Sequence, residues 1–243
     1  MKTIKASQKR KHGSDVFQIE ILYPGAALGL NDTGFYTIGR IDHASFRPPG
    51  IVPMHLHRDD EILSYMRSGL QTHKDSAGHQ QQISRTHLMM MNAGSGFSHE
   101  EIAEKEVEML QIFMRPRENG LPPKVQFHEF ASAYSENKWR LVAGDLAEAP
   151  LEIRTQTNIF DVRLDAEQQL EVPLADKTVV HLLYCFDGSI TLAGQILRKG
   201  DSVVFQKERL SVKALERSNL VLFQIDAKAS YSKTGMFSGN QYL

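Results

Sequence analysis

The chain has 243 residues, of which 41% are hydrophobic and 23% are charged, the composition of an ordinary globular protein. Its 28 Lys and Arg nearly balance its 29 Asp and Glu, and the net charge of -1 argues against a nucleic-acid or anionic-membrane partner. No run approaches the roughly 18 apolar residues of a membrane span. The single Cys excludes an intrachain disulfide and indicates a reducing cytoplasm.

The first residues of the chain form its one concentrated basic run. The run consists of Lys2, Lys5, Lys9, Arg10, Lys11 and His12. It lacks the apolar core of a secretory signal. We therefore interpret it as a solvated terminus.

Short apolar or alternating runs then recur along the chain, separated by Gly, Pro, Asn or Asp, and none shows a long 3.6-residue period. In chain order they are Val16–Leu22, Phe35–Ile41, Ile62–Met66, Leu88–Met91, Val107–Met114, Ile159–Leu164, Val179–Phe186, Ser202–Phe205 and Asn219–Ile225. This pattern predicts a mostly β protein. Cys185 falls within one of these runs and is predicted to be a buried strand residue.

The two halves of the chain resemble one another, which predicts two copies of one small β-barrel. Residues 62–69 echo 181–188, and 109–112 echo 222–225 in the same order. Prolines in the segment 115–123 mark the exit from the first copy. We expect a first barrel over residues 1–126 and a second over 127–243. The second range includes the linker, where 127–150 could add a short helix and a strand, and a tail that Phe237 and Tyr242 could anchor.

Two pairs of side chains predict a metal site. Successive side chains of a strand point to opposite faces, so His55 and His57 share one face, and His99 and Glu101 share another. Glycines 94 and 96 give the backbone freedom just before the second pair. Bringing the pairs together gives three imidazoles and one carboxylate. This set suits Fe, Ni, Cu, Mn or Zn, whereas a thiolate site needs cysteines that the chain lacks.

These motifs resemble those of the pirins, a branch of the bicupins within the cupin superfamily. The resemblance is carried by Met54–Tyr65, Asp75–His79, Met91–Glu101 and Gln111–Gly120, and it is close over about residues 45–128. It implies an all-β bicupin, with two jelly-roll cupin barrels packed face to face. One metal is then expected in the N-terminal barrel and none in the C-terminal barrel.

By the same resemblance, the pirin metal ligands correspond to His55, His57, His99 and Glu101. Glu61 occupies the carboxylate position of the general cupin motif and competes with Glu101, which we favour because pirins use that position. Two departures from the pirin pattern are Leu56, where Pro is common, and Thr86-His87, where a Gly-Asp turn is usual. Neither removes a ligand.

Two functions are compatible with this site. Several pirins open a flavonol such as quercetin with O₂, which implies a quercetinase-type oxidoreductase with Glu101 as the catalytic base. Other pirins are redox-dependent transcriptional cofactors, which implies a metal-binding regulator with a protein partner and no catalysis. We expect one divalent transition metal, iron first, with Ni, Cu, Mn, Co or Zn as alternatives. For the enzyme, the expected partners are a small aromatic substrate and O₂.

The remaining Met and His side chains have ordinary interpretations. Core filling is the default for Met54, Met66, Met89, Met90, Met91 and Met114, although they could also form an apolar wall for an aromatic substrate. His73, His79 and His87 are predicted to lie in turn or edge segments as exposed or hydrogen-bonded residues. His43, His128 and His181 have no ligand-spaced neighbour.

Overall fold

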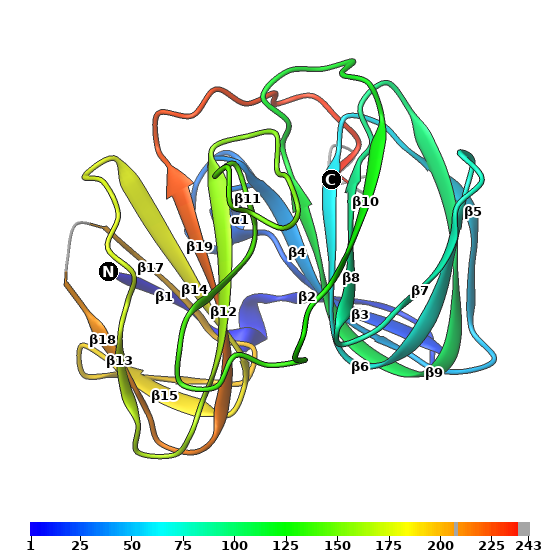
Figure 1. Ribbon diagram of the computed structural model, residues 1–243. Coiled ribbons are helices and arrows are strands. Elements are labelled where there is room, and N and C mark those ends of the chain that lie inside the picture. Colours follow the sequence, from blue (N-terminus) through cyan, green and yellow to red (C-terminus); the bar gives the residue numbers. More distant parts are fainter. Residues whose placement is uncertain (207–208, 238–243) are drawn as a thin grey trace. The chain divides into compact units, whose positions relative to one another are not determined.

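The computed structural model describes residues 1–206 and 209–237 (Figure 1). The described chain is almost entirely β and confirms the predicted fold class. Its helical segments are the 3-10 turn η1 (Ala6–Gln8) and the single-turn helix α1 (Pro24–Ala27). The chain divides into two compact units. The N-terminal unit consists of 9–133 together with the segment that begins at Ser230, and the C-terminal unit consists of 1–8 and 134–229.

The N-terminal unit is a nine-stranded antiparallel sheet built around two long strands, β6 and β9. Its strands are β2 (Arg10–Gly13), β3 (Phe17–Leu22), β4 (Ile38–Phe46), β5 (Ile51–His57), β6 (Glu61–Asp75), β7 (Gln80–Ile83), β8 (His87–Asn92), β9 (Phe97–Met114) and β10 (Lys124–Glu129). The sheet order is β10-β8-β6-β9-β4-β3-β2, with β5 paired to β9 and β7 paired to β6. Register shifts between Met66 and Gln71 interrupt the β6–β9 pairing. Such bulges bend a sheet toward a barrel.

One buried face of β6 and β9 is unusually polar. It carries Ser64, Gln71, His73, His99, Glu101 and Gln111, all buried. Burying polar groups costs free energy unless they find hydrogen-bond or ligand partners. We call this polar face of β6 and β9 the buried wall. It is the strongest candidate for a binding site in the N-terminal unit.

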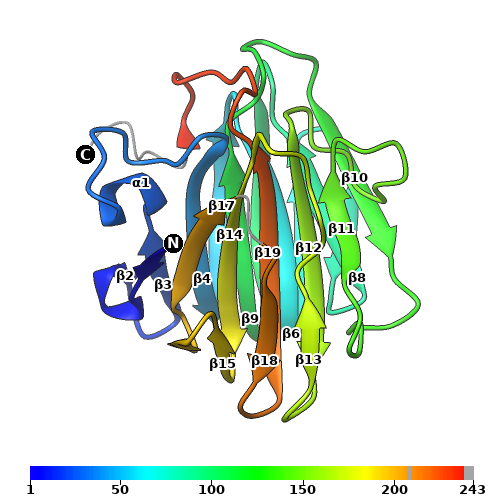
Figure 2. The same ribbon diagram turned by 90° about the vertical axis from the view of Figure 1, so that its left-hand side faces the viewer.

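The C-terminal unit has an apolar interior instead. Its strands are β1 (Lys2–Ile4), β11 (Arg140–Gly144), β12 (Thr157–Leu164), β13 (Gln169–Glu171), β14 (Val179–Asp187), β15 (Ser189–Leu192), β16 (Gln195–Arg198), β17 (Ser202–Gln206), β18 (Ser211–Ala214) and β19 (Ser218–Asp226). One sheet has the order β1-β17-β14-β19-β12-β11 (Figure 2), and the other has the order β13-β18-β15-β16. Leu183, Cys185 and Leu220 lie in its core. Burial raises the pKa of the Cys185 thiol to about 12, so Cys185 is the packing residue that the sequence predicted.

The basic N-terminal run is solvated for the most part, as predicted, since five of its six named residues are exposed and only Lys9 is buried. The run is nevertheless folded into strands, which the interpretation as a terminus did not predict. Its first residues form β1, which pairs with β17, and Ile4 is buried with 1% of its surface exposed. Lys5 Nζ binds Asp201 at 3.1 Å. Lys9 is also buried, and its Nζ lies 2.8 Å from Glu20 in the N-terminal unit. Ile4, the apolar residue between Lys2 and Lys5, is the buried residue of β1. An interpretation based on the charges alone does not predict this strand.

The units also differ from the expected division at residues 126 and 127. β10 pairs with β8, so the chain leaves the N-terminal unit only after Ala133. The described part of 127–150 forms β11 but no helix. The tail returns to the N-terminal unit, where Phe237 is 2% exposed and its backbone N–H donates to the Asp60 carboxylate. Phe237 is thus an anchor as expected, whereas Tyr242 lies outside the described residues.

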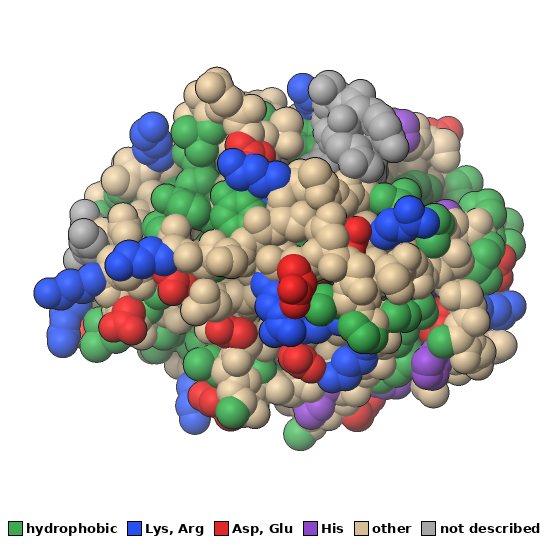
Figure 3. Space-filling view, turned by 90° about the horizontal axis from the view of Figure 1, so that it is seen from above, with side chains coloured by type: hydrophobic (Ala, Val, Ile, Leu, Met, Phe, Trp, Pro, Cys, Tyr) green, Lys and Arg blue, Asp and Glu red, His purple; other side chains and the backbone are tan. Residues whose placement is uncertain are grey.

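The surface gives no sign of a single strongly charged field on the face shown in Figure 3. Lys and Arg side chains are interspersed there with Asp and Glu, as the near-zero net charge suggests. Within residues 1–206 and 209–237, no helix has both the length and the apolar character needed to cross a membrane.

Candidate metal centre

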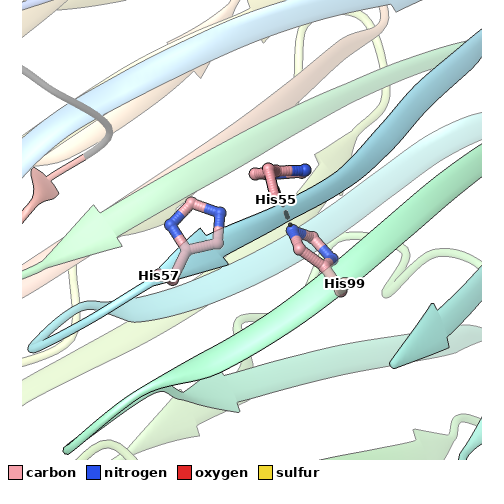
Figure 4. Close-up of side chains that lie close together, drawn as sticks. All are labelled: His55, His57 and His99. Carbon is pink, nitrogen blue, oxygen red and sulfur yellow. Dashed lines mark hydrogen bonds between the residues drawn. The ribbon is translucent and has the colours of Figure 1, made fainter. Parts of the chain in front are cut away.

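Three histidines converge where β5 pairs with β9 in the N-terminal unit (Figure 4). His55 is directly opposite His99, and His57 is opposite Phe97. One ring nitrogen from each histidine lies within 4.8 Å of the others, and His55 Nε2 and His99 Nε2 are 3.0 Å apart. The structure thus brings together three of the four side chains predicted to be ligands.

The His57 side chain fits a metal ligand. It is 4% exposed, and its Nδ1 lies 3.0 Å from Asp60 Oδ2. A carboxylate can only accept, so Nδ1 carries a proton, and in the neutral ring Nε2 then has the lone pair. That buried Nε2 has no hydrogen-bond partner among the described residues. Since an orphaned buried nitrogen is costly, a cation in front of it is the simplest explanation.

His55 and His99 are buried in a way that favours neutral rings. His55 Nδ1 donates to the Pro53 carbonyl at 2.8 Å, which leaves its Nε2 as an acceptor. Burial lowers the pKa of His55, and it lowers the pKa of His99 well below its usual value. Metal binding requires neutral imidazole, so burial prepares both rings before a metal arrives.

Glu101, the fourth predicted ligand, is not part of the group of three. It is 3% exposed, and the side-chain amides of Gln71 and Gln111 donate to its Oε1 at 2.9 Å and 3.2 Å. Burial raises the pKa of Glu101 to about 6, although these amides and His57 oppose the rise. Glu101 follows His99 by two residues on β9 and so points to the same face of the strand, with its Oε1 held by the two amides.

Glu61, the competing carboxylate, points elsewhere. Its neighbour Ile62 is opposite Phe113, whose ring centroid lies 6.1 Å from that of His57. Because side chains alternate along a strand, Glu61 faces the other side of the sheet. There Asn92 Nδ2 donates to Glu61 Oε2 at 3.1 Å. Glu61 therefore does not face the three histidines.

A cavity of about 400 Å³ lies in the same unit. It is lined by Ser76, Ala77, His79, Gly96, Phe97, Pro123, Lys124 and Val125. One lining residue, Phe97, lies near the histidines, with its ring centroid 6.4 Å from that of His99. The volume falls in the range of small-molecule sites, roughly 300–1,000 Å³.

Comparison with known proteins matches both halves of the chain to described families. The pirin family matches residues 34–114, and the family described as quercetinase C-terminal cupin domain matches residues 141–225. A putative quercetin 2,3-dioxygenase of Pseudomonas aeruginosa is 30% identical over 178 residues, which cover 71% of this chain and 76% of that protein. The chain belongs to the pirin family. Quercetin 2,3-dioxygenase of Escherichia coli K12 is 26% identical over 176 residues, or 70% of this chain and 74% of that protein.

Solved structures share the fold of this chain. The bacterial pirin YhhW from Escherichia coli, in complex with nickel(II), has a TM-score of 0.81 at 22% identity, covering 93% of this chain and 98% of that one. Quercetin 2,3-dioxygenase from Acinetobacter baumannii has a TM-score of 0.76 at 19% identity, covering 96% and 92%. These likenesses establish the cupin architecture of this pirin family member.

The structure also shows groups around the histidines that the sequence did not reveal. Asp60, the Pro53 carbonyl and His73 each contact the Nδ1 of one histidine, while Gln71 and Gln111 hold Glu101. Strand alternation could have found Gln111, which lies an even number of residues from Glu101 on one strand. His73 was wrongly placed in a turn or edge segment, because β6 continues to Asp75 and His73 is fully buried.

The methionines mostly fill the core. Met66, Met89, Met90, Met91 and Met114 are fully buried, whereas Met54 is 52% exposed. Core filling, the default interpretation, therefore describes five of the six.

Gly94 fixes the loop that precedes His99, and its replacement gives a testable prediction for this pirin. Its φ is +50°, and an added Cβ would lie 1.9 Å from the Leu121 carbonyl oxygen. Gly120 also has a positive φ, +72°, but no atom lies within 4 Å of the corresponding Cβ position. We expect Gly120→Ala to cost about 1 kcal/mol from backbone strain alone, and Gly94→Ala about 1–3 kcal/mol more from the collision.

Urea unfolding of the two variants measures this difference. Metal content should also fall only in Gly94→Ala, because the Gly94 carbonyl accepts from the Asp59 N–H beside Asp60. Equal destabilisation of the two variants would contradict the steric explanation.

Proposed function

We propose that this pirin is a metal-dependent dioxygenase that opens a flavonol such as quercetin with O₂. We assign the metal to His55, His57, His99 and Glu101. The observation that carries the proposal is the convergence of three imidazoles, one with an orphaned buried Nε2, beside a buried carboxylate. The names of the E. coli and P. aeruginosa relatives support the same activity.

The donor set fits one divalent transition metal. Imidazole and carboxylate suit iron, nickel, copper, manganese, cobalt and zinc; we propose iron first, with nickel as the leading alternative because an E. coli pirin binds nickel(II). When bound, the metal would lower the pKa of a coordinated substrate hydroxyl and hold the reactants together. We assign no metal to the C-terminal unit, whose core is filled by apolar residues such as Leu183 and Leu220.

Glu101 is the group we assign to proton transfer. Its Oε1 is held by Gln71 and Gln111, so Oε2 can face the metal and the substrate hydroxyl. A buried carboxyl with a pKa near 6 holds a proton more readily than an exposed one. Glu101 can therefore take the hydroxyl proton as a general base within the buried wall.

The cavity beside Phe97 supports a planar aromatic substrate. Phe97, Pro123 and Val125 provide apolar surface, and Lys124 adds a positive charge to the lining. Such a surface suits an aromatic ring system with phenolic oxygens. With its single cysteine buried and unpaired, the chain is compatible with the cytoplasmic location that we propose.

A regulatory role is the second candidate, because one feature of β5 favours it. This strand pairs only with β9 among the described strands, and it carries His55 and His57. Between and beside them, Leu56 is 43% exposed and Met54 is 52% exposed. A change at the metal could therefore alter an exposed apolar surface that a protein partner would bind.

An oxygen-electrode assay with quercetin tests the enzyme directly. Protein reconstituted with Fe, Ni, Cu, Mn or Co in turn is compared with metal-free protein and with the same metal free in solution. We expect at least one form to consume O₂ in step with the loss of flavonol absorbance. Should no form exceed its free-metal control with any flavonol, while metal oxidation changes binding to a protein partner, the regulatory function replaces the dioxygenase.

A further inference from the structure

We infer that Asp75 and His73 are positioning residues that fix the tautomer of His99, so that His99 Nε2 faces the metal. The inference rests on the proposed metal centre and adds two residues that are not themselves metal ligands. It also gives a role to Asp75, which the proposed reaction leaves unused.

A continuous series of side chains leads away from His99. His99 Nδ1 lies 3.4 Å from His73 Nδ1, and His73 Nε2 lies 2.9 Å from Asp75 Oδ2. The His73 ring is fully buried, lies parallel to the Phe97 ring at a centroid distance of 6.2 Å, and meets Phe127 edge-on at 6.0 Å. Packing therefore holds the His73 ring in one plane.

The Asp75 carboxylate is fixed from its other side. The backbone N–H groups of Ala77 and His79 donate to Oδ1 at 2.9 Å and 3.0 Å. His79 Nδ1 also lies 2.9 Å from Oδ2, with the His79 side chain 45% exposed. Burial would raise the pKa of Asp75, but hydrogen bonds from His73 and His79 hold it below its usual value. Asp75 is thus ionised and can only accept.

The direction of each hydrogen bond follows from that carboxylate. Because Asp75 accepts, His73 Nε2 must donate, and the neutral His73 ring then has a lone pair on Nδ1. That lone pair accepts from His99 Nδ1–H, so the lone pair of His99 is on Nε2. His55 Nε2 also has a lone pair, because His55 Nδ1 donates to Pro53. Two lone pairs 3.0 Å apart repel each other unless a cation lies between them.

Replacing Asp75 by Asn should reverse these directions. The Asn oxygen would keep the two backbone N–H donors, so its amide nitrogen would face His73 Nε2. His73 Nε2 would then accept, its Nδ1 would carry the proton, and that N–H would oppose His99 Nδ1–H. To avoid this repulsion, His99 would move its proton to Nε2, the nitrogen that the metal needs.

The experiment measures zinc affinity by competition with a chromophoric chelator, and ring tautomers by ¹⁵N NMR of the metal-free full chain at pH 8. We expect Asp75→Asn to weaken Zn²⁺ binding by about 10–100-fold, as for other groups that orient metal ligands, and to shift His99 toward the Nε2–H tautomer. Glu100→Gln is the matched control, because it removes one charge beside His99 without entering the series. Glu100→Gln should bind Zn²⁺ within about threefold of the unsubstituted protein.

A second pair of variants decides the question if Asp75→Asn does not fold. His73→Phe removes the acceptor, whereas His73→Asn places an amide oxygen where Nδ1 was. We expect weakened Zn²⁺ binding in the Phe variant and recovery in the Asn variant. An unchanged His99 tautomer with unchanged affinity in Asp75→Asn, or equal losses in the two His73 variants, overturns the inference. If the unsubstituted protein binds no Zn²⁺, the metal centre fails, and the tautomers of the metal-free chain still test the series.

Discussion

The His57→Ala protein is expected to be purified with less than about a tenth of the metal of the unsubstituted chain. Changes in groups that merely orient a ligand already cost about 10–100-fold in metal affinity, and His57 is one of the three imidazoles that form the site. Its loss also removes the ring that Asp60 holds in place. Elemental analysis of protein loaded with one equivalent of iron or nickel measures the result, and O₂ consumption with quercetin should disappear with the metal.

His43→Ala is the matched control for this loss. His43 is also a buried histidine of the N-terminal unit, with 8% of its surface exposed, but its Nε2 lies 3.0 Å from Glu108. Its substitution should lower stability while leaving one metal per chain. Full metal content in His57→Ala and in His99→Ala would sink the ligand assignment.

Glu101→Gln should reduce turnover far more than it reduces substrate binding. The amide cannot take the hydroxyl proton, and loss of a general base typically costs about 10²–10⁴-fold in rate. The effect should therefore appear in kcat, with KM for quercetin little changed. The measurement requires a metal-loaded variant, so the metal content must be determined in the same samples and the rate expressed per bound metal.

Glu61→Gln separates the two carboxylates. Glu61 is also buried, but it faces Asn92 on the other side of the sheet. Its variant should keep more metal than Glu101→Gln and most of the turnover per bound metal. The reverse order would move both the ligand and the base to Glu61.

Much of the fold could be predicted from the sequence because strand periodicity is local. All nine runs overlap strands, but β4 begins only at Ile38, and β6 and β9 extend well beyond Ile62–Met66 and Val107–Met114. The missed parts are rich in His, Gln and Glu, residues that a hydrophobic pattern excludes from strands. These residues still form strands, because the buried face of β6 and β9 to which they contribute is polar rather than apolar. Residues 1–8 belong to the C-terminal unit, and the segment that begins at Ser230 belongs to the N-terminal unit. This assignment could not be predicted, because it depends on contacts between distant parts of the chain, such as the pairing of β1 with β17.

The histidine cluster could be predicted because strand alternation is local. The groups that contact the histidine rings could not be predicted in this way. Alternation places His55 and His57 on one face, and a single pairing of β5 with β9 completes the group. The groups that fix the rings come from a carbonyl, a turn and another strand, as with Pro53, Asp60 and His73. Such contacts depend on tertiary register, which one sequence does not reveal.

An anomalous-scattering crystal structure of the iron-loaded or nickel-loaded protein, recorded at the metal edge, tests the metal centre most directly. The arrangement predicts one peak per chain, about 2.0–2.2 Å from the Nε2 atoms of His55, His57 and His99 and from one oxygen of Glu101. A metal peak away from these nitrogens, or none in crystals of loaded protein, would contradict the assignment.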